Sequence, residues 1–270
     1  MYFMTDPISM MRVFRRLSLE AGEIVMKFYD LGNFDIILKG DNSPVTLADK
    51  EADKHISKGI MEHFSEIPLV TEEQAQTHKG KHDNFIIVDP LDGTKEFISR
   101  NGDFTINIAY VENGEPVIGV VYAPAKQRLF YTLPESGAVE EYYPFDEVSN
   151  NRLKFLKPRN PDNEQLIMIA SKSHRTKATE EYISRYNVSE LKSAGSSLKF
   201  CLLASGEADI YPRLGRTMEW DTAAGHAILR ACGGEVVKCE SHSPLLYGKP
   251  FYENPFFVAY VKGVNLKGNG

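Results

Sequence analysis

The sequence predicts a layered α/β (α+β) sandwich in which helices pack against β-sheets. Two helical patterns of apolar residues occupy 7–28 and 46–64, and strand-like alternation fills 104–131. Beyond residue 163, short apolar strands alternate with helical stretches. Strands and helices that are mixed in this way indicate stacked layers of helix and sheet.

The N-terminal half begins with two amphipathic helices and continues with two short strands. Asp6 and Pro7 supply an N-cap and a proline at the first helical position, and apolar residues then recur at spacings of three and four for about five turns. A second helix begins near Thr46. The apolar runs 67–70 and 85–88 each continue directly into acidic residues. We expect two buried strands that deliver carboxylates at their C-terminal ends.

The strand-like region 104–131 begins with a hairpin. Residues 104–108 alternate between apolar and polar, Asn113-Gly114 is a typical hairpin turn, and residues 117–122 form the returning strand. This part of the N-terminal half is therefore expected to be antiparallel sheet.

A polar segment at 142–163, rich in Asn, Pro and charge, separates two predicted lobes. We place an N-terminal α+β lobe at 1–155 and a C-terminal α/β lobe at 156–270. The C-terminal lobe is expected to contain a strand at 166–170, helices at 176–186 and 197–205, a strand at 208–211, a helix at 221–232, and strands at 235–237 and 257–261.

Composition excludes several classes of protein. A net charge of −6 argues against binding to duplex nucleic acid, which favours a basic surplus, but it allows a small anionic ligand. Three cysteines without a C-x-x-C pair argue against a disulfide framework or a cysteine zinc site. The sequence contains no apolar run of the roughly 20 residues that span a membrane, and no signal-peptide core. We expect a cytoplasmic protein; weak attachment to the inner face of a membrane and the oligomeric state stay open.

The strongest local signal is Val88-Asp89-Pro90-Leu91-Asp92-Gly93-Thr94, where an apolar strand ends in a tight acidic turn. Two carboxylates about 4 Å apart repel each other by about 4 kcal/mol at an effective dielectric constant near 20. Such a pair needs a cation, a proton or wide solvent exposure. Oxygen ligands select Mg²⁺, Mn²⁺ or Ca²⁺, so the run is consistent with a metal site, and a solvated acidic turn is the alternative.

Other acidic residues have structural alternatives of their own. Glu72 and Glu73 follow the apolar run 67–70, where loop acidity would also explain them. Asp221 begins a helix of small residues, where an ordinary N-cap is the alternative. Asp49 has capping-box spacing from Thr46, which is a purely structural role.

Basic and hydroxyl side chains gather in three later runs: 171–175, 195–199 and 211–213. These residue types bind phosphate, and Gly-Ser-Ser at the start of a helix suits an anion. Surface charge and a capped helix explain the same residues without a ligand.

Two motifs together resemble one superfamily. Asp89–Thr94 matches the pattern Asp-Pro-aliphatic-Asp-Gly-Thr, and Trp220–Gly225 matches Trp-Asp-x-Ala-Ala-Gly. Both are typical of the inositol monophosphatase superfamily of magnesium-dependent, lithium-sensitive phosphatases. The resemblance covers nearly the whole chain and is strongest to the branch of 3'(2'),5'-bisphosphate nucleotidases of the CysQ type. Three further runs carry that branch resemblance: Lys95–Ile98, Arg100–Thr105 and Gly195–Cys201.

The resemblance implies a sugar-phosphatase fold of two lobes, with a magnesium site between them. Glu72, Asp89 and the Leu91 carbonyl would hold the first Mg²⁺. Asp89, Asp92 and Asp221 would hold the second. The catalytic pair would be Asp49 and Thr94, hydrogen-bonded to each other so as to activate the attacking water.

The resemblance also implies a substrate and its contacts. The reaction would be hydrolysis of the 3'-phosphate of adenosine 3',5'-bisphosphate (PAP) to AMP and phosphate by water that two Mg²⁺ ions activate, with the sulfated relative PAPS, which would give APS, as a second substrate. The Gly93 and Thr94 amides would hold phosphate oxygens. Ser196, Lys199 and Arg213 would hold the second phosphate, and His174 would lie beside the nucleoside. The side chains or carbonyls of Glu72, Leu91, Asp92 and Asp221 would also border the substrate.

Two other functions are weighed against this interpretation. An enzyme of the same fold could act on inositol phosphates or fructose 1,6-bisphosphate, and the carboxylates alone do not separate these substrates. The runs Lys95–Phe97 and 196–213 favour the bisphosphorylated nucleotide. A non-catalytic nucleotide sensor is disfavoured, because Asp49, Thr94 and the acidic ligands are all present.

Overall fold

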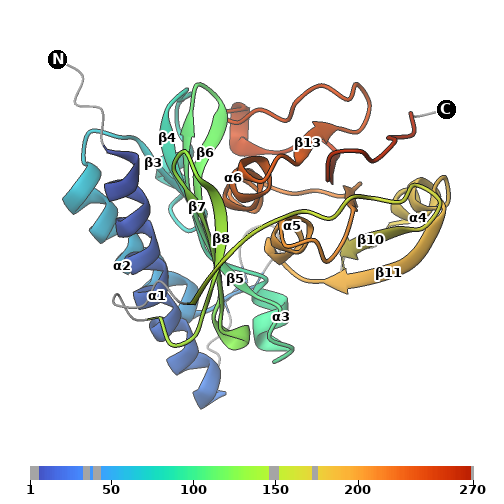
Figure 1. Ribbon diagram of the computed structural model, residues 1–270. Coiled ribbons are helices and arrows are strands. Elements are labelled where there is room, and N and C mark those ends of the chain that lie inside the picture. The colour runs from blue at the N-terminus through green and yellow to red at the C-terminus, as the bar shows by residue number, and fades with distance from the viewer. Residues whose placement is uncertain (1–5, 33–36, 39–43, 146–151, 172–175, 269–270) are drawn as a thin grey trace.

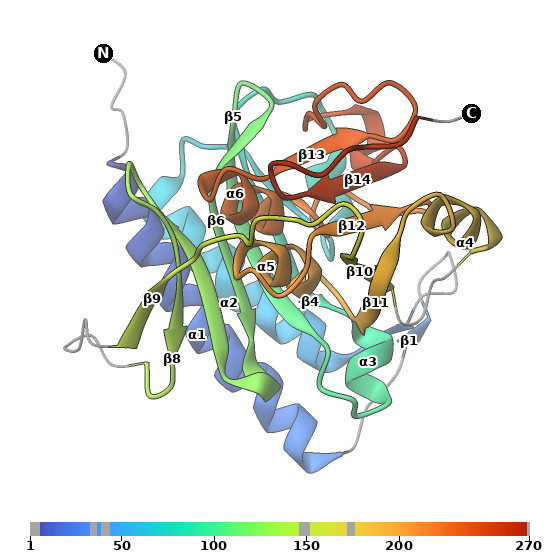
Figure 2. The ribbon, with the colours of Figure 1, turned by 45° about the vertical axis from the view of Figure 1, so that its right-hand side comes forward.

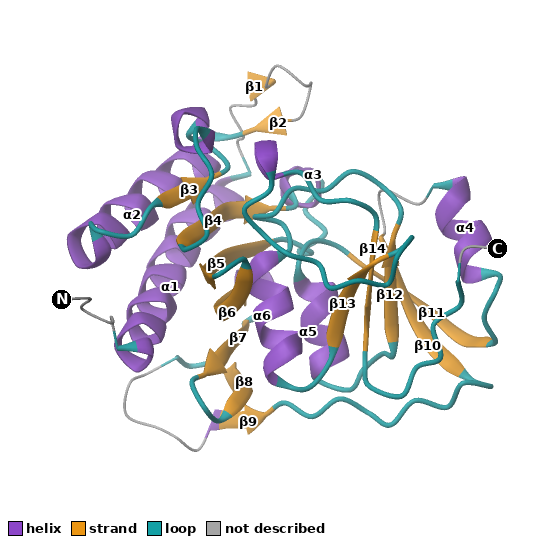
Figure 3. Ribbon diagram, turned by 90° about the horizontal axis from the view of Figure 1, so that it is seen from above, coloured by secondary structure: helices purple, strands orange, loops and turns teal. Residues whose placement is uncertain are grey.

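Two β-sheets organise the structure, and helices cover or separate them. The computed structural model describes residues 6–32, 37–38, 44–145, 152–171 and 176–268. Viewed from above in Figure 3, the layers run helix, sheet, helix, sheet, helix. The outer layers are α1 (Pro7–Leu31) with α2 (Leu47–Phe64) on one side and α4 (Lys177–Ile183) on the other. This arrangement confirms the layered sandwich that the sequence predicts.

The larger sheet has seven strands, and it is antiparallel except for its first pair, β3 and β4. In spatial order the strands are β3 (Leu69–Thr71), β4 (Phe85–Asp92), β5 (Thr105–Glu112), β6 (Glu115–Ala123), β7 (Arg128–Leu133), β8 (Gly137–Tyr142) and β9 (Leu153–Phe155). A separate two-stranded ribbon joins β1 (Ile37–Leu38) and β2 (Pro44–Val45).

Strand β4 is buried on both faces because it lies between two helix layers. Phe85 and Ile87 belong to the core shared with the smaller sheet, whereas Ile86 and Val88 belong to the core beneath α1 and α2. Successive side chains of a strand point to opposite faces, so a strand covered on both sides is apolar throughout. The continuous apolar run therefore has a structural cause, and it brings the acidic turn to the end of a rigid element.

The caps of the first two helices form as predicted. The Asp6 carboxylate accepts hydrogen bonds from the backbone N–H groups of Ile8 and Ser9, and α1 ends at Gly32 in the left-handed conformation. Thr46 caps α2 in a capping box with Asp49. Both helices pack on the same face of the larger sheet (Figure 1).

The smaller sheet has five strands in the order β11-β10-β12-β14-β13, and two helices separate it from the larger sheet (Figure 2). Its strands are β10 (Leu166–Ser171), β11 (Val188–Ala194), β12 (Ile210–Arg213), β13 (Glu235–Lys238) and β14 (Phe257–Tyr260). The helices between the sheets are α5 (Leu198–Ala204) and α6 (Ala223–Ala231). The remaining elements are α3 (Thr94–Ile98) and the short 3₁₀ helices η1 (Ala75–His78), η2 (Pro124–Lys126) and η4 (Pro250–Tyr252).

Some elements differ from the prediction, each for a local reason. The sequence does not predict β8, β9 or β11; β11 is a largely solvent-exposed edge strand, so it lacks the apolar alternation of a half-buried strand. The helix expected at 176–186 ends at Ile183, where i to i+3 hydrogen bonds tighten the chain into a turn. The strand expected at 208–211 lies two residues later, as β12.

Helix α6 approaches the larger sheet closely at a glycine. A Cβ on Gly119 of β6 would lie 2.4 Å from the Ala224 carbonyl oxygen and 2.9 Å from the Ala227 Cβ. Only glycine leaves room for the backbone of α6 at this distance. This contact fixes the distance between α6 and the larger sheet. It therefore also fixes the position of the segment before α6 relative to that sheet.

Membrane-spanning helices were sought among the described residues. None of the helices there combines the length and the apolar character that a crossing requires.

We predict that Gly119→Ala lowers the free energy of unfolding by about 1–3 kcal/mol, because the new methyl group must push α6 away from the sheet. Thermal unfolding measures the effect. Gly215→Ala is the matched control, since its Cβ would meet its nearest neighbours at 3.9 Å, an ordinary contact distance. Equal melting temperatures for the two variants would contradict the close approach of α6.

Candidate functional site

Asp89 and Asp92 lie at the end of β4, and a β-bulge turns both toward the same side. Asp89 pairs with Asn107 and Asp92 with Thr105, so β4 advances three residues where β5 advances two. In a regular strand, residues three positions apart point to opposite faces, and the extra residue reverses this. Pro90 lies within the bulge, where the missing N–H costs no ladder hydrogen bond. The spacing of the motif therefore directs two carboxylates to one point.

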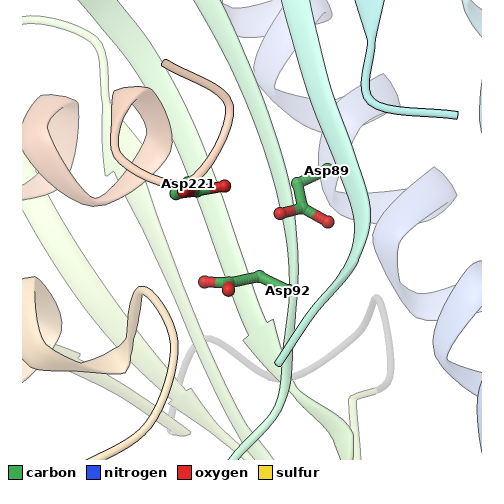
Figure 4. A group of neighbouring side chains, drawn as sticks. All are labelled: Asp89, Asp92 and Asp221. Carbon is green, nitrogen blue, oxygen red and sulfur yellow. The ribbon is translucent and has the colours of Figure 1, made fainter. Parts of the chain in front are cut away.

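Asp221 brings a third carboxylate to that point from the segment before α6. Figure 4 shows the three side chains facing a common space, with Asp89 and Asp92 on one side and Asp221 on the other. One oxygen from each residue lies within 4.8 Å of the others. We call Asp89, Asp92 and Asp221 the acidic triad. Its spacing allows one cation to contact all three residues.

The acidic triad is electrostatically costly without a cation. Loss of hydration is the main cause that raises the pKa of Asp92 to about 6; repulsion from Glu72 and Glu96 adds to it, and the positive charge of Lys199 opposes it. The same two causes raise the pKa of Asp221, and Asp92 and Glu72 are its repelling neighbours. A bound cation would reverse the balance, because opposite charge favours ionised carboxylates.

Asp221 does not cap α6, so that structural alternative is wrong. Thr222 occupies the N-cap position of α6 and makes no side-chain cap there. The Asp221 carboxylate instead accepts a hydrogen bond of 2.8 Å from the backbone N–H of Met218. The Met218 N–H thus holds one oxygen of the Asp221 carboxylate, and the side chain points toward Asp89 and Asp92.

Ser197 joins the two sides of the triad, a role that the sequence did not indicate. Its backbone N–H and its hydroxyl both approach Asp92 Oδ2, at 2.7 and 3.2 Å. The same hydroxyl lies 2.6 Å from the Asp221 carbonyl oxygen, to which it donates. The run Gly-Ser-Ser was the available signal, but it did not distinguish Ser197 from Ser196.

Asp49 is buried, and it makes both the capping box with Thr46 and the hydrogen bond with Thr94 that the resemblance implies. One carboxylate oxygen, Oδ2, accepts hydrogen bonds from the backbone N–H and the hydroxyl of Thr46, at 2.8 and 2.6 Å. The other, Oδ1, lies 3.1 Å from Thr94 Oγ1, which donates to it. Burial is the main cause that raises the pKa of Asp49, which makes the carboxylate a better proton acceptor.

Glu72 and Leu91 lie near Asp49 and Thr94. The Glu72 N–H donates to the Val88 carbonyl at 3.2 Å, so Glu72 continues β3 beside the end of β4. Its negative charge raises the pKa of Asp49 as well as those of the two triad members above. The Leu91 N–H donates to Asp89 Oδ1 at 3.0 Å, and the Leu91 carbonyl lies 3.4 Å from Thr94 Oγ1.

The expected phosphate-binding residues are found in mixed surroundings. Lys199 is almost fully buried, its ammonium donates to the Ser196 carbonyl at 2.5 Å, and burial lowers its pKa to about 8. The buried Ser196 hydroxyl and the buried Arg213 Nε have no hydrogen-bond partner within the part of the chain that the structure describes. Gly93 adopts the left-handed conformation at the start of α3, with φ of 94°. His174 lies outside the described residues.

The fold and the acidic site define the class of protein, and comparison with known sequences gives the same class. A profile of the inositol monophosphatase family matches residues 6–259, and the chain belongs to this family.

Individual members of this family resemble the chain in sequence and in structure over most of its length. The chain is 40% identical over 224 residues to the 3'(2'),5'-bisphosphate nucleotidase CysQ of Shigella flexneri. The aligned region covers 82% of this chain and 87% of that relative. The crystal structure of CysQ from Bacteroides thetaiotaomicron is 39% identical, with a TM-score of 0.80 over 97% of this chain and 98% of that one. An inositol monophosphatase of Thermotoga maritima is 27% identical, with a TM-score of 0.75 over 93% and 91% of the two chains.

We predict that the metal-free protein loses stability as the pH rises from about 4 to 6. The pKa of Asp92 is 3.8 when unperturbed and about 6 in the folded protein, so folding favours the protonated form, and its advantage disappears as the carboxylate ionises. At about 1.4 kcal/mol per pKa unit, the loss amounts to about 1–3 kcal/mol.

Urea unfolding in excess chelator, measured for wild type and Asp92→Asn across this pH range, tests this prediction. The variant removes the ionisable group, so its stability should decline less with pH and exceed that of wild type at pH 7. Asp30→Asn, at an exposed position on α1, is the control and should follow wild type. Parallel curves for wild type and Asp92→Asn would show that Asp92 carries no such penalty.

Proposed function

We propose that this protein is a magnesium-dependent phosphoric monoester hydrolase that converts PAP to AMP and phosphate. The observation that carries the proposal is the acidic triad together with the hydrogen bond that Thr94, two residues after Asp92, donates to Asp49. The relatives that are named 3'(2'),5'-bisphosphate nucleotidase support the choice of substrate. PAPS is proposed as a second substrate because it has the same ribose 3'-phosphate.

Mg²⁺ is the proposed cofactor, and the residues present fit it. The donors are hard oxygen atoms, and the pKa values of Asp92 and Asp221 are raised by burial and by neighbouring acidic groups, which a cation would offset. In this proposal Glu72, Asp89 and the Leu91 carbonyl hold one ion, and the triad holds another, so that Asp89 belongs to both sets. Bound Mg²⁺ supplies positive charge that stabilises the oxygens around phosphorus during displacement.

Thr94 and Asp49 are proposed to carry the proton of the attacking water. Because Thr94 Oγ1 donates its own hydrogen to Asp49 Oδ1, its lone pairs are free to accept a hydrogen bond from water. As the water attacks phosphorus, Thr94 takes up the water proton and passes its own to Asp49. The raised pKa of Asp49 favours this transfer, and Thr46 holds the carboxylate in place.

The substrate phosphates are proposed to lie on either side of Asp92. The backbone amides of Gly93 and Thr94 would hold the phosphate under attack. Ser196, Lys199 and Arg213 would hold the second phosphate; among the described residues the Ser196 hydroxyl and Arg213 Nε have no hydrogen-bond partner, which supports this assignment. His174 is proposed to lie beside the nucleoside.

We further propose that 1–155 and 156–270 act as two lobes that meet at the site. Asp89 and Asp92 come from the first, and Asp221 comes from the second. The hydrogen bonds from Ser197 to Asp92 cross from one lobe to the other. Relative movement of the lobes would therefore change the spacing of the triad directly.

A substrate panel tests the proposed function. Phosphate release is measured from PAP, PAPS and inositol 1-phosphate, each with Mg²⁺ and with excess chelator. The proposal expects rapid release from PAP that disappears with chelator. A marked preference for inositol 1-phosphate would reject the nucleotide substrate, and undiminished release in chelator would reject the role of Mg²⁺.

We predict that Thr94→Val lowers kcat for PAP at least about 100-fold, because the valine side chain has nearly the same shape but cannot relay a proton. Thr94→Ser keeps the hydroxyl and is the matched control, with kcat expected within about tenfold of wild type. Steady-state kinetics at saturating Mg²⁺ provide the comparison. Similar kcat values for the two variants would remove Thr94 from proton transfer.

A further inference from the structure

His78 lies between the segment that carries Glu72 and the segment that carries Asp221. It is the last residue of η1, and its Nε2 lies 2.8 Å from the carbonyl oxygen of Thr71, the residue before Glu72. Its ring stacks on the indole of Trp220, the residue before Asp221, with ring centroids 4.8 Å apart and planes inclined by 25°. A single side chain thus contacts the neighbours of two predicted ligands that are far apart in the sequence.

Each polar group of Thr71 makes a hydrogen bond, so the position of Thr71 constrains the backbone of Glu72, the next residue. The Thr71 N–H donates to the Thr77 hydroxyl at 3.1 Å, and its own hydroxyl donates to the Asp53 carboxylate on α2. The Gln74 side chain donates to the other Asp53 oxygen at 2.7 Å. Residues on both sides of Glu72 in the sequence are therefore bound to the same carboxylate. The Thr71 carbonyl is approached by His78 Nε2 at 2.8 Å, by the Gln74 N–H at 3.3 Å and by the Thr77 hydroxyl at 3.4 Å. Loss of His78 would therefore remove the shortest of these contacts, directly before the backbone of Glu72.

Trp220 is also held firmly by its surroundings, so the stacking contact with His78 constrains the backbone of Asp221, the next residue. The adjacent Glu219 is fully buried and accepts hydrogen bonds from the backbone N–H groups of Gly248 and Lys249, at 2.8 and 2.9 Å. One residue further toward the N-terminus, the Met218 carbonyl accepts a hydrogen bond of 2.7 Å from the Asn254 side chain. Only 7% of Trp220 is exposed, so its ring has little freedom to follow a displaced His78 without moving the loop.

The chemistry of histidine suits both contacts. A carbonyl oxygen only accepts, so Nε2 must carry a hydrogen and donate it. The flat ring offers a face to the indole while its edge makes this hydrogen bond. Phenylalanine would keep the face and lose the donor, and glutamine would keep a donor and lose the face.

We infer that His78 is a positioning residue that ties Glu72 to Asp221 and so sets the spacing of the carboxylates that bind metal. This inference rests on the proposed function, because it assigns His78 a role in arranging the proposed magnesium ligands. In this inference His78 acts through its contacts with Thr71 and Trp220. Residues that orient metal ligands from behind commonly change metal affinity by 10- to 100-fold when they are replaced.

The test compares His78→Phe and His78→Gln with wild type in two measurements. The first is the Mg²⁺ concentration that gives half-maximal release of phosphate from PAP. The second, without substrate, is the rise of melting temperature with added Mg²⁺, which reports binding to the folded protein. Both variants should need about tenfold more Mg²⁺ in both measurements, with kcat at saturating Mg²⁺ less affected. Lys79→Gln, at the exposed neighbouring position, is the control and should match wild type.

A Trp220→Leu variant and its combination with His78→Gln test the route of coupling. If His78 acts on Asp221 through the indole, the double variant should need little more Mg²⁺ than Trp220→Leu alone. Independent, multiplying effects would overturn the coupling through Trp220.

The outcomes separate this inference from the proposed function. The inference is overturned if wild type depends on Mg²⁺ and both His78 variants bind Mg²⁺ as tightly as wild type. It is also overturned if the variants change only the melting temperature without metal, since His78 would then be merely structural. A wild-type protein whose activity and melting temperature ignore Mg²⁺ would overturn the proposed function, and the inference with it.

Discussion

Repulsion among three crowded carboxylates is the constraint on which the site depends. Asp89, Asp92 and Asp221 bring oxygens within 4.8 Å of one another, and burial together with repulsion from nearby acidic groups raises the pKa values of Asp92 and Asp221. Left to themselves, such side chains would turn apart or take up protons. Backbone and hydroxyl donors hold each of them from behind, among them the N–H groups of Leu91, Ser197 and Met218. The fold therefore maintains an arrangement that becomes favourable when a cation binds.

The surrounding layers maintain this arrangement from both sides. The bulge in β4 aims two carboxylates, and the close contact of α6 with Gly119 fixes the height of the third. Ser197 then links one side to the other through Asp92 and the Asp221 carbonyl. Because the site is built from the end of strand β4 and from the segments that precede helices α5 and α6, small changes in packing far from the triad would alter its spacing. Such dependence is expected where binding geometry must be held closely.

The sequence predicts what depends on local pattern and misses what depends on tertiary contact. The capped helix α1 and the apolar strand β4 were predictable because periodicity and caps are properties of neighbouring residues. The motifs also indicated the triad, although sequence alone could not decide whether Asp221 was a helix cap. The edge strand β11 escaped because exposed strands need no apolar alternation. Ser197 and His78 escaped because their partners lie far away in the chain, at distances that no local pattern encodes.

Diffraction from crystals grown with Mn²⁺ in place of Mg²⁺ shows whether the triad binds a divalent cation. Manganese shares the preference for oxygen ligands and scatters anomalously. We expect an anomalous peak within coordination distance of the carboxylates of Asp89, Asp92 and Asp221. No peak at that position under saturating Mn²⁺, with the three side chains ordered, would contradict cation binding by the triad.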